Sequence, residues 1–331
     1  MSWELQRSAD RDIHQMVIFA GSASASLTGS ICKYLKVPLG RALVSRFPDT
    51  ETLVKIDDDV RGKDCFVVQS TCPPVNDNLM ELLIFIDSLR RASAKRITAV
   101  IPYYGYARQD RKSEGRTPIT AKLVANMLTK AGVNRVLTMN LHADQIQGFF
   151  DIPLDHLTAA PVLARHIQTR NLENAVFVSP DVGNVKFGTD FASRIGADLA
   201  VIHKRRVSAD STVAVQMIGN VRGKNVMMFD DMITTAGTVC EAAKLVREHG
   251  ATGIYVATTH AVFSGPAVER LAGAGLTEIV VTDTIPMKPE TLKALKNLTI
   301  LSVADLIGEA IRRIHEHRSI SELFCSPGTG G

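Results

Sequence analysis

Short apolar runs recur along the chain, and most of them alternate with longer segments that have helical periodicity. We predict strands at these apolar runs, which span residues 17–19, 39–44, 65–68, 97–101, 136–139, 176–178, 199–202, 226–229, 254–258 and 279–281. Helical patterns occupy residues 78–91 and 239–247, each after a turn that follows an apolar run. This alternation favours parallel sheets with crossover helices, whose ligands bind at the carboxyl ends of the strands.

The four residues Val-Arg-Gly-Lys occur twice, at 60–63 and at 221–224, about half the chain apart. Each copy precedes an apolar run, a turn, a helical pattern and a further apolar run. The repeated succession predicts two similar α/β domains in tandem. We place the junction between Asp155 and Pro161, which gives domains of residues 13–158 and 159–325.

Composition narrows the class of protein. The 331 residues are 45% hydrophobic and carry a formal net charge of +4, which suits small anionic substrates. The sequence has no basic stripe for nucleic acid and no apolar run of membrane-spanning length, so we expect neither as a partner. The five cysteines lack Cys-X-X-Cys spacing and the start of the chain lacks a proper signal peptide, so we expect reduced thiols and a cytoplasmic location.

Residues 226–238, Val-Met-Met-Phe-Asp-Asp-Met-Ile-Thr-Thr-Ala-Gly-Thr, indicate an anion site. Four apolar residues precede Asp230 and Asp231, and small residues lead into the next helix. Backbone N–H groups at a helix N-terminus can hold a phosphate. The two acids would repel that phosphate, so we assign them to the hydroxyls of a sugar or to a metal-bridged diphosphate.

The first copy of the repeat lacks these features. Gln69 and Ser70 stand where the second copy has its two acids, and Pro73-Pro74 removes two N–H donors from the loop. We therefore predict that the first domain has lost sugar-phosphate binding and has kept a supporting or nucleotide-binding role.

Two clusters of cations follow predicted strands. The polar segment 106–118 is either a solvated surface loop or a mobile flap that carries cations onto a polyphosphate. Residues 203–206, His-Lys-Arg-Arg, are either an exposed turn or a phosphate clamp. In such a clamp Lys offers a point charge and Arg a bidentate fork to a phosphoryl group in transit.

Further candidate side chains also follow strands. His142 and Asp181 together suit Mg²⁺, which keeps several waters and takes other oxygens from substrate phosphates, so His142 would act through water or on the phosphate. The segment 47–51, Phe-Pro-Asp-Thr-Glu, could stack a purine on its aromatic ring and accept from its amino group. The alternative for that segment is a plain turn with a buried Phe.

A series of motifs occurs in the same order as in one known family. These are FPDTE, PPVNDNLMELL, YARQDRK, PITAKLVANML, NLHADQIQGFFDIP, SPDVG, HKRR, DDMITTAGT and FSGPA. From about Met16 to Phe324 the chain resembles the ribose-phosphate pyrophosphokinases, which synthesise 5-phosphoribosyl 1-pyrophosphate (PRPP). The resemblance implies an α/β fold of two tandem type I phosphoribosyltransferase-like domains, each a mainly parallel sheet flanked by helices. It also implies transfer of the diphosphoryl group of Mg-ATP to the 1-hydroxyl of ribose 5-phosphate, which gives PRPP and AMP.

The resemblance implies a role for each matching residue. Those that would bind ATP are Phe47, Asp49 and Glu51, acting across a subunit boundary, together with Arg108, Gln109 and His142. His142 and Asp181 match the positions that engage Mg²⁺ and its phosphate ligands, and Lys204 and Arg206 match the catalytic loop. The residues that would bind ribose 5-phosphate are Asp230, at the ribose hydroxyls, with its neighbour Asp231 as a supporting residue, and Thr234, Thr235, Ala236, Gly237 and Thr238, at the 5-phosphate.

The sequence departs from the family pattern at Thr50 (usually Gly), Asn140 (often Asp), Asn184 (Gly) and Thr234 (usually Asp). Asn140 carries no charge, which puts a metal contact there in doubt, whereas Thr234 keeps a hydroxyl donor beside the phosphate. Two other functions remain possible at this point: a non-catalytic regulatory homologue and a PRPP-consuming phosphoribosyltransferase. The resemblance further implies a homohexamer built from dimers, with ADP or phosphate as effectors at a subunit interface.

Overall fold

The computed structural model describes residues 15–180, 185–206 and 213–323, and these divide into two compact units. The first unit comprises residues 15–158, 284–286 and 302–323, and the second comprises the described residues of 159–283 and 287–301. The units divide after Thr158, and the chain returns to the first unit at Ser302. The predicted second domain, 159–325, therefore extends too far, because the last helix of the chain packs within the first unit.

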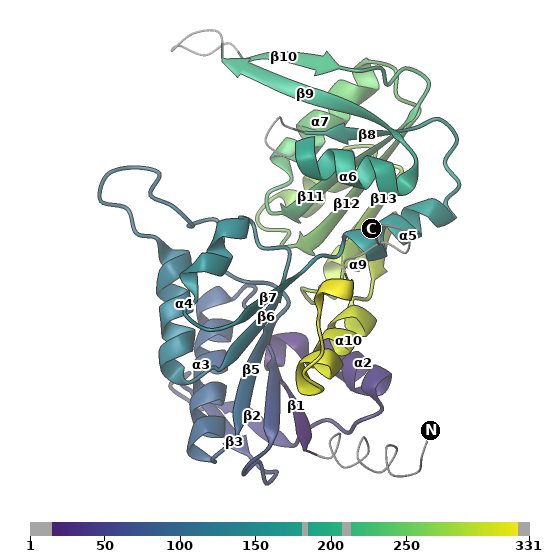
Figure 1. Cartoon of the computed structure of the whole chain (residues 1–331). Coiled ribbons are helices and arrows are strands. Elements are labelled where there is room, and N and C mark those ends of the chain that lie inside the picture. The colour runs from purple at the N-terminus through teal and green to yellow at the C-terminus, as the bar shows by residue number, and fades with distance from the viewer. Residues whose placement is uncertain (1–14, 181–184, 207–212, 324–331) are drawn as a thin grey trace, which may run out of the picture. The chain divides into compact units, whose positions relative to one another are not determined.

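A five-stranded parallel sheet forms the centre of the first unit, in the order β1-β4-β5-β6-β7. Its strands are β1 (Met16–Ala20), β4 (Asp64–Val68), β5 (Arg96–Ile101), β6 (Arg135–Met139) and β7 (Leu154–Leu157). Helices α3 (Val75–Arg91) and α4 (Thr120–Ala131) cover one face, and α2 (Ala25–Leu35) and α10 (Ala304–His315) cover the other (Figure 1). Short 3-10 helices lie in the connections: η1 (Ser22–Ser24), η2 (Asp144–Phe149) and η3 (Ser321–Leu323).

The core of the first unit forms because successive strand residues are apolar on both faces. Phe19 and Val67 pack with Phe85 of α3, and the rings of Phe19 and Phe85 lie 5.5 Å apart. Ile18 and Phe66, one position earlier on the same strands, point to the opposite face and are also fully buried. Strands that are covered on both sides read as continuous apolar runs, which is why the sequence located them.

A hairpin of β2 (Ala42–Arg46) and β3 (Thr52–Ile56) forms a separate antiparallel sheet that packs on α3. Strand β2 begins later than the predicted strand 39–44, because Leu39 forms a bridge with Ile18 of β1 instead. The sequence did not predict β3, whose residues are mostly half-exposed and give no continuous apolar run. Residues 47–51 form the tip of this hairpin.

A seven-stranded sheet forms the centre of the second unit, in the order β10-β9-β8-β11-β12-β13-β14. Its strands are β8 (Ala175–Ser179), β9 (Asp198–Arg206), β10 (Val213–Ile218), β11 (Asn225–Ile233), β12 (Gly253–Ala261), β13 (Glu278–Thr282) and β14 (Leu298–Leu301). Only β10 among them is antiparallel to its neighbour. Helices α5 (Ala160–Thr169) and α6 (Val185–Ile195) cover one face, and α7 (Gly237–Glu248) and α8 (Ala267–Gly273) cover the other (Figure 1). Helix α9 (Pro289–Ala294) lies between β13 and β14 in the chain.

The two Val-Arg-Gly-Lys segments form the same turn in the two units. Gly62 has φ 73° and Gly223 has φ 69°, and in each turn the Lys N–H donates to the Val carbonyl, at 3.0 and 3.1 Å. The glycine N–H groups donate to equivalent carbonyls, Ser93 at 2.9 Å and Gly250 at 2.8 Å. The internal repeat is therefore a repeat of hydrogen-bonded structure, and both domains have the predicted parallel sheet flanked by helices.

The first copy of the repeat fills the place of the acids with a network of its own side chains. Gln69 and Ser70 are fully buried. The Gln69 Nε2 donates to Glu81 Oε1 at 2.9 Å, and Glu81 also accepts from the N–H and the hydroxyl of Ser22, both at 2.7 Å. The Ser70 N–H donates to the Ser24 hydroxyl at 2.9 Å. Since the chain itself satisfies these polar groups, a sugar would have to displace them.

The described cysteines are free thiols. Cys32, Cys65 and Cys72 are buried, and this burial raises their pKa values to about 11, about 12 and about 11. They are therefore protonated and unreactive at neutral pH. No helix in the described part of the chain is long and apolar enough to cross a membrane.

Candidate active site

Strand β11 carries the two acids of the second unit. The sequence predicted that this strand ends at residue 229, but it continues through Ile233, because Asp230 pairs with Thr258 and Met232 with His260 of β12. Asp230 and Asp231 are half-buried, and the Asp231 N–H donates to Asp230 Oδ1 at 2.9 Å. Successive residues of a strand alternate in direction, so the two acids lie on opposite faces, with Asp230 on the face that α7 covers.

The loop after β11, residues 234–236, leads directly into α7, and we call it the anion loop. Gly237 and Thr238 belong to the first turn of the helix rather than to the predicted loop 234–238. Ala236 has φ 60° and ψ 10°, a left-handed conformation that is uncommon for a residue with a side chain. No described side chain caps this end of α7, whose N–H groups and positive dipole end favour an anion.

The second sheet reverses its strand order at β8. From β8 the chain proceeds to β9 on one side, whereas β11 lies on the other side of β8. Ligands of open α/β sheets bind at such reversals, beyond the carboxyl ends of the strands. In the first sheet the named strands follow one order from β1 to β7, and Leu39 forms a parallel bridge with Ile18 on the other edge of β1.

Both neighbours of β8 extend beyond it. Strand β9 pairs with β8 as far as Val201 and then continues to Arg206, with β10 as its partner. The segment 203–206 is therefore strand and not the exposed turn that was one of its predicted forms. Positions 204 and 206 on β9, like Asp230 on β11, lie past the end of the pairing with β8. The side chains of Lys204 and Arg206, and all of Asp181, lie outside the described part of the structure.

In the first unit, two neighbouring loops carry predicted ATP-binding residues. Arg108 and Gln109 follow β5, and His142 follows the adjacent strand β6, and all three residues are exposed. A hydrogen bond of 2.6 Å from Gln145 Nε2 to Asp110 Oδ2 joins the two segments. The structure thus brings Arg108, Gln109 and His142 to one edge of the first sheet.

The remaining predicted ATP-binding residues, Phe47, Asp49 and Glu51, lie on the hairpin tip. Phe47 is 47% exposed, which contradicts the alternative of a turn with a buried Phe. The first turn of α3 contacts both this hairpin and the loop after β5: Arg46 Nη2 donates to Asp77 Oδ2 at 3.0 Å, and the Tyr106 hydroxyl bonds to Asn76 Oδ1. The base of the tip therefore lies at the same edge of the unit as the loop after β5.

His156 of β7 braces the segment that carries His142. Its Nε2 accepts the Leu141 N–H at 2.8 Å, and its side chain is 16% exposed. Burial lowers the pKa of His156, and the nearby Asp144 carboxylate offsets this only in part. A neutral ring is what the bond requires, since Nε2 must keep its lone pair to accept from the backbone.

Comparisons with known proteins agree over nearly the whole chain. Family models match residues 16–132, as the N-terminal domain of ribose phosphate pyrophosphokinase, and residues 207–325, as the phosphoribosyl synthetase-associated domain. A ribose-phosphate pyrophosphokinase from Rhodopirellula baltica is 55% identical over 94% of this chain and 99% of its own length. The chain belongs to the ribose-phosphate pyrophosphokinase family.

Other members of the ribose-phosphate pyrophosphokinase family give the same picture. The protein of that name from Campylobacter jejuni is 50% identical over 93% of this chain and 98% of its own length. The phosphoribosylpyrophosphate synthetase from Mycobacterium smegmatis has a similar structure, with a TM-score of 0.86 and 44% identity over 91% of this chain and 99% of its own.

Two departures from the family pattern have a conformational meaning. Thr50 has φ 76°, a left-handed value that accounts for the usual Gly at this position. Asn140 has φ 39°, and Asn and Asp are the residues with side chains that tolerate this region best. Thr234 is half-buried and its carbonyl accepts the Ser264 N–H at 2.8 Å, while Asn184 lies outside the described residues.

The described residues contain no cluster of three or more His, Cys, Asp or Glu side chains that could hold a metal ion. Mg²⁺ does not require one, because it is commonly bound by one or two carboxylates together with water and substrate phosphates. The half-buried Asp230 and Asp231 are hard oxygen donors of that kind. His142 is a nitrogen donor and fits Mg²⁺ only through water or phosphate.

Sequence reasoning missed two residues that shape these loops. His156 showed no signal, because it stands alone in a short, half-buried strand. Arg270 could have been found, since it closely follows the FSGPA motif, which comes directly after β12. Its Nη1 donates to the Thr235 carbonyl of the anion loop at 3.0 Å.

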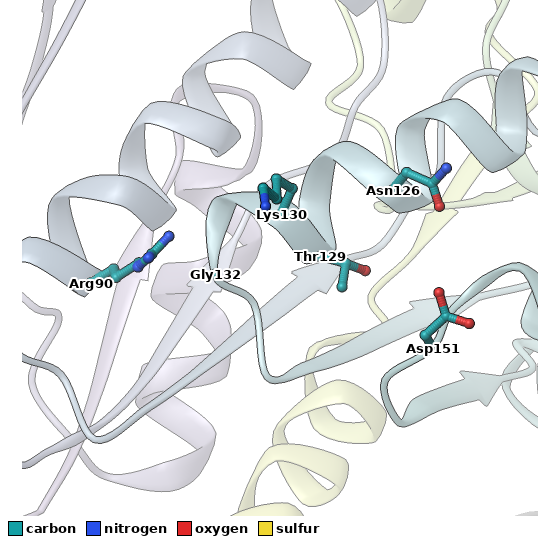
Figure 2. A pocket seen from close by; sticks show the side chains of 6 residues that line it. All are labelled: Arg90, Asn126, Thr129, Lys130, Gly132 and Asp151. Atoms are coloured by element: carbon teal, nitrogen blue, oxygen red, sulfur yellow. The ribbon is translucent and has the colours of Figure 1, made fainter.

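A separate hollow of about 640 Å³ lies on the first unit at the C-terminal ends of α3 and α4 (Figure 2). Its lining contains none of the predicted site residues and consists of Arg90, Asn126, Thr129, Lys130, Gly132 and Asp151. It opens at the ends of helices rather than beyond the carboxyl ends of the strands. The hollow is therefore separate from the loops of the first unit that contain the predicted ATP-binding residues.

Proposed function

We propose that the chain transfers the diphosphoryl group of ATP to the 1-hydroxyl of ribose 5-phosphate, so that PRPP forms and AMP leaves. One observation supports this function most directly: the anion loop and Asp230 lie next to the strand-order reversal of the second sheet. At the corresponding positions of the first unit, Gln69 and its partners form an internal hydrogen-bond network instead. A sugar phosphate needs both an anion site and acceptors for hydroxyls, and the second unit offers them together.

The two units would divide the substrates between them. Thr234, Thr235, Ala236, Gly237 and Thr238 would hold the 5-phosphate, and Asp230 would hold the ribose hydroxyls with Asp231 as a supporting residue of the same site. Arg108, Gln109 and His142 would bind ATP at the edge of the first sheet, with Phe47, Asp49 and Glu51 contributed from a neighbouring subunit. Mg²⁺, when bound with the phosphates of ATP, would neutralise their charge.

The chemical step needs alignment and charge neutralisation more than covalent help. The 1-hydroxyl oxygen forms a bond to the β-phosphorus, the bond from that phosphorus to the α-phosphate oxygen breaks, and the hydroxyl proton passes to solvent. The strand positions of Lys204 and Arg206, two apart on β9 beyond the end of β8, suit cations that neutralise the transferring group. Asp181 would contact the metal and its phosphate ligands.

The two alternative functions explain fewer features. A PRPP-consuming phosphoribosyltransferase would need neither the duplicated domain nor the exposed hairpin tip. The relatives named ribose-phosphate pyrophosphokinase match over nearly the whole length of this chain, with both domains included. A non-catalytic regulatory homologue would not need Lys204, Arg206 and Asp230, all of which the sequence retains.

Replacing Lys204 by alanine tests the function. Loss of one electrostatic contact to the transferring group typically removes about 3–4 kcal/mol of transition-state stabilisation, so we expect kcat to fall by roughly two to three orders of magnitude. Circular dichroism and substrate binding should remain close to those of the wild type, because β9 is held by backbone pairing with β8 and β10. A kcat near that of the wild type would contradict the assignment.

Assembly, effectors and location are further parts of this proposal. We infer a cytoplasmic homohexamer whose rate depends on phosphate and is inhibited by ADP, as the family resemblance implies. Light scattering tests the assembly: a monomeric mass at assay concentration would contradict it. A rate that responds to neither phosphate nor ADP would contradict the regulation, and fractionation of the producing cells tests the location.

A further inference from the structure

Three successive carbonyl groups, those of residues 233–235, accept hydrogen bonds from the segment after β12 and from α8. The Ile233 carbonyl accepts the Phe263 N–H at 3.0 Å, and the Thr234 carbonyl accepts the Ser264 N–H at 2.8 Å. The Thr235 carbonyl accepts from Arg270 Nη1 at 3.0 Å. The segment after β12 and Arg270 of α8 therefore hold the loop through its carbonyl groups.

This arrangement fixes the direction of the loop N–H groups. In a planar trans peptide the carbonyl of one residue and the N–H of the next point in opposite directions. The N–H groups of Thr234, Thr235 and Ala236 are consequently directed away from the segment that holds the carbonyls. Three successive N–H groups on one side form a concave donor array of the kind that binds phosphate.

Only one of the three holding groups is a side chain. Phe263 and Ser264 act through their backbone and are themselves fixed, since Phe263 has φ 43° and the Ala267 N–H donates to the Ser264 carbonyl at 3.3 Å. Arg270 lies on α8, whose Ala267 and Leu271 are buried in the core of the second unit. The backbone of α8 is thereby held while the exposed guanidinium reaches to the loop.

The guanidinium also adds charge at this position. Arg270 Nη1 would lie 3.6 Å from a Cβ atom built on Gly237, so the cation stands beside the first turn of α7. A positive charge beside a helix N-terminus strengthens the field that favours a bound anion.

We propose that Arg270 is a positioning residue for the anion loop. It holds the Thr235–Ala236 peptide so that the Ala236 N–H faces the 5-phosphate of the sugar. This inference rests on the proposed function, because it takes the sugar phosphate as the ligand of the loop. Arg270 acts through the loop and not on the reacting atoms, so its removal should affect binding of ribose 5-phosphate far more than the chemical step.

The test is a pair of arginine substitutions on the same unit. Arg270→Gln removes the guanidinium from the loop. The matched control is Arg247→Gln, because Arg247 also donates to backbone carbonyls, those of Ala274 at 2.9 Å and Gly275 at 2.6 Å, but from the last turn of α7. Arg270→Lys keeps the charge with a single shorter donor and serves as a second variant if the glutamine substitution impairs folding.

We expect Arg270→Gln to raise the KM for ribose 5-phosphate about tenfold, the change that loss of a charge-assisted hydrogen bond gives. The KM for ATP and kcat should stay within about twofold, Arg270→Lys should be intermediate, and Arg247→Gln should match the wild type. A rise in both KM values together, or a rise equal to that of Arg247→Gln, would overturn the positioning role.

Calorimetry with ribose 5-phosphate separates this inference from the proposed function. Binding is measured without turnover, so a weaker Kd in Arg270→Gln than in Arg247→Gln supports the positioning role even if the wild type produced no PRPP. An unchanged Kd would refute the positioning role even if the wild type were fully active.

Discussion

Single residues adopt unusual backbone conformations in the segments that we propose bind the substrates. Ala236 and Thr50 both have left-handed φ angles, 60° and 76°, and both belong to segments assigned to substrates. Such a conformation costs about 1–2 kcal/mol for a residue with a side chain, and strain of this kind clusters at functional sites. At Ala236 it turns the chain from the end of β11 into α7 within one short loop.

Ala236→Val tests whether this conformation matters for the sugar phosphate. A β-branched side chain fits the left-handed region poorly, and Ala236 is only 5% exposed, so the substitution should displace the loop. We expect the KM for ribose 5-phosphate to rise about tenfold while the KM for ATP changes little. Steady-state kinetics with the other substrate saturating provides the measurement.

Ala236→Gly is the control for the loop conformation. Glycine adopts positive φ without strain, so this variant should bind ribose 5-phosphate nearly as well as the wild type. If the valine variant kept the wild-type KM, the loop geometry would not be what holds the phosphate.

At the scale of elements, the last helix of the chain is attached to the first unit by a buried carboxylate. Asp64 of β4 pairs with Arg96, and His315 Nδ1 of α10 lies 2.7 Å from Asp64 Oδ2. Arg96 Nη2 also donates to the Ile314 carbonyl at 3.1 Å. Burial alone would raise the pKa of Asp64, but the hydrogen bonds from His315 and Arg96 outweigh it and lower the pKa below its ordinary value.

Asp64→Asn should therefore destabilise the protein. Removing one partner of a buried ion pair typically costs about 3–5 kcal/mol, whereas Asp87→Asn, which removes the exposed pair of Asp87 with Arg91, should cost less than about 1 kcal/mol. Urea unfolding of the two variants provides the comparison. Equal free energies of unfolding would show that Asp64 does not hold α10.

The pH dependence of the same pair has a definite sign. Because the pKa of Asp64 is lower in the folded state, its contribution is present above the ordinary carboxyl value of 3.8 and is lost as the pH falls through the folded-state pKa. The Asn variant should lack this acid-dependent loss. A wild-type unfolding free energy that fell no more steeply in acid than that of the variant would contradict the assignment.

The sequence predicted elements well where both faces of a strand are covered. Strands β4, β5, β6, β11 and β12 were found from continuous apolar runs, and their order along the chain indicated parallel sheets. Strand ends were predicted less well, because charged residues were taken to end β9 and β11, whereas pairing with β10 and β12 carries both strands on through them. The short half-buried strands β3, β7 and β14 give no continuous apolar run, and they were missed.

The candidate site could be predicted in part for a similar reason. The motif at 226–238 indicated an anion site, because small residues before a helix leave backbone N–H groups accessible to a phosphate, and this depends on the local sequence alone. The position of Arg270 just after the FSGPA motif marks it as a candidate, but its contact with Thr235, 35 residues away, and the contact of His156 with Leu141 arise only from the folded arrangement of the strands. The turn at 60–63 and 221–224 was predicted as a repeat, and the structure shows why it recurs: both glycines need positive φ.

At the scale of the whole molecule, the two units have similar sheets and different ligand edges. Only the second copy of the repeat keeps two acids and a loop of small residues that leads into a helix without a side-chain cap. In the first copy, Gln69 occupies one of the corresponding positions and forms a hydrogen-bond network with Glu81. This difference between the two copies supports the proposal that the second unit binds the sugar phosphate and the first unit binds ATP.

In the proposed reaction a diphosphoryl group, and not a single phosphoryl group, moves to ribose 5-phosphate. Incubation with Mg²⁺, ribose 5-phosphate and ATP labelled at the β-phosphate tests it most directly, with products separated by chromatography. We expect the label to pass to PRPP while unlabelled AMP forms in equal amount. Retention of the label in ADP, or the absence of AMP, would contradict it.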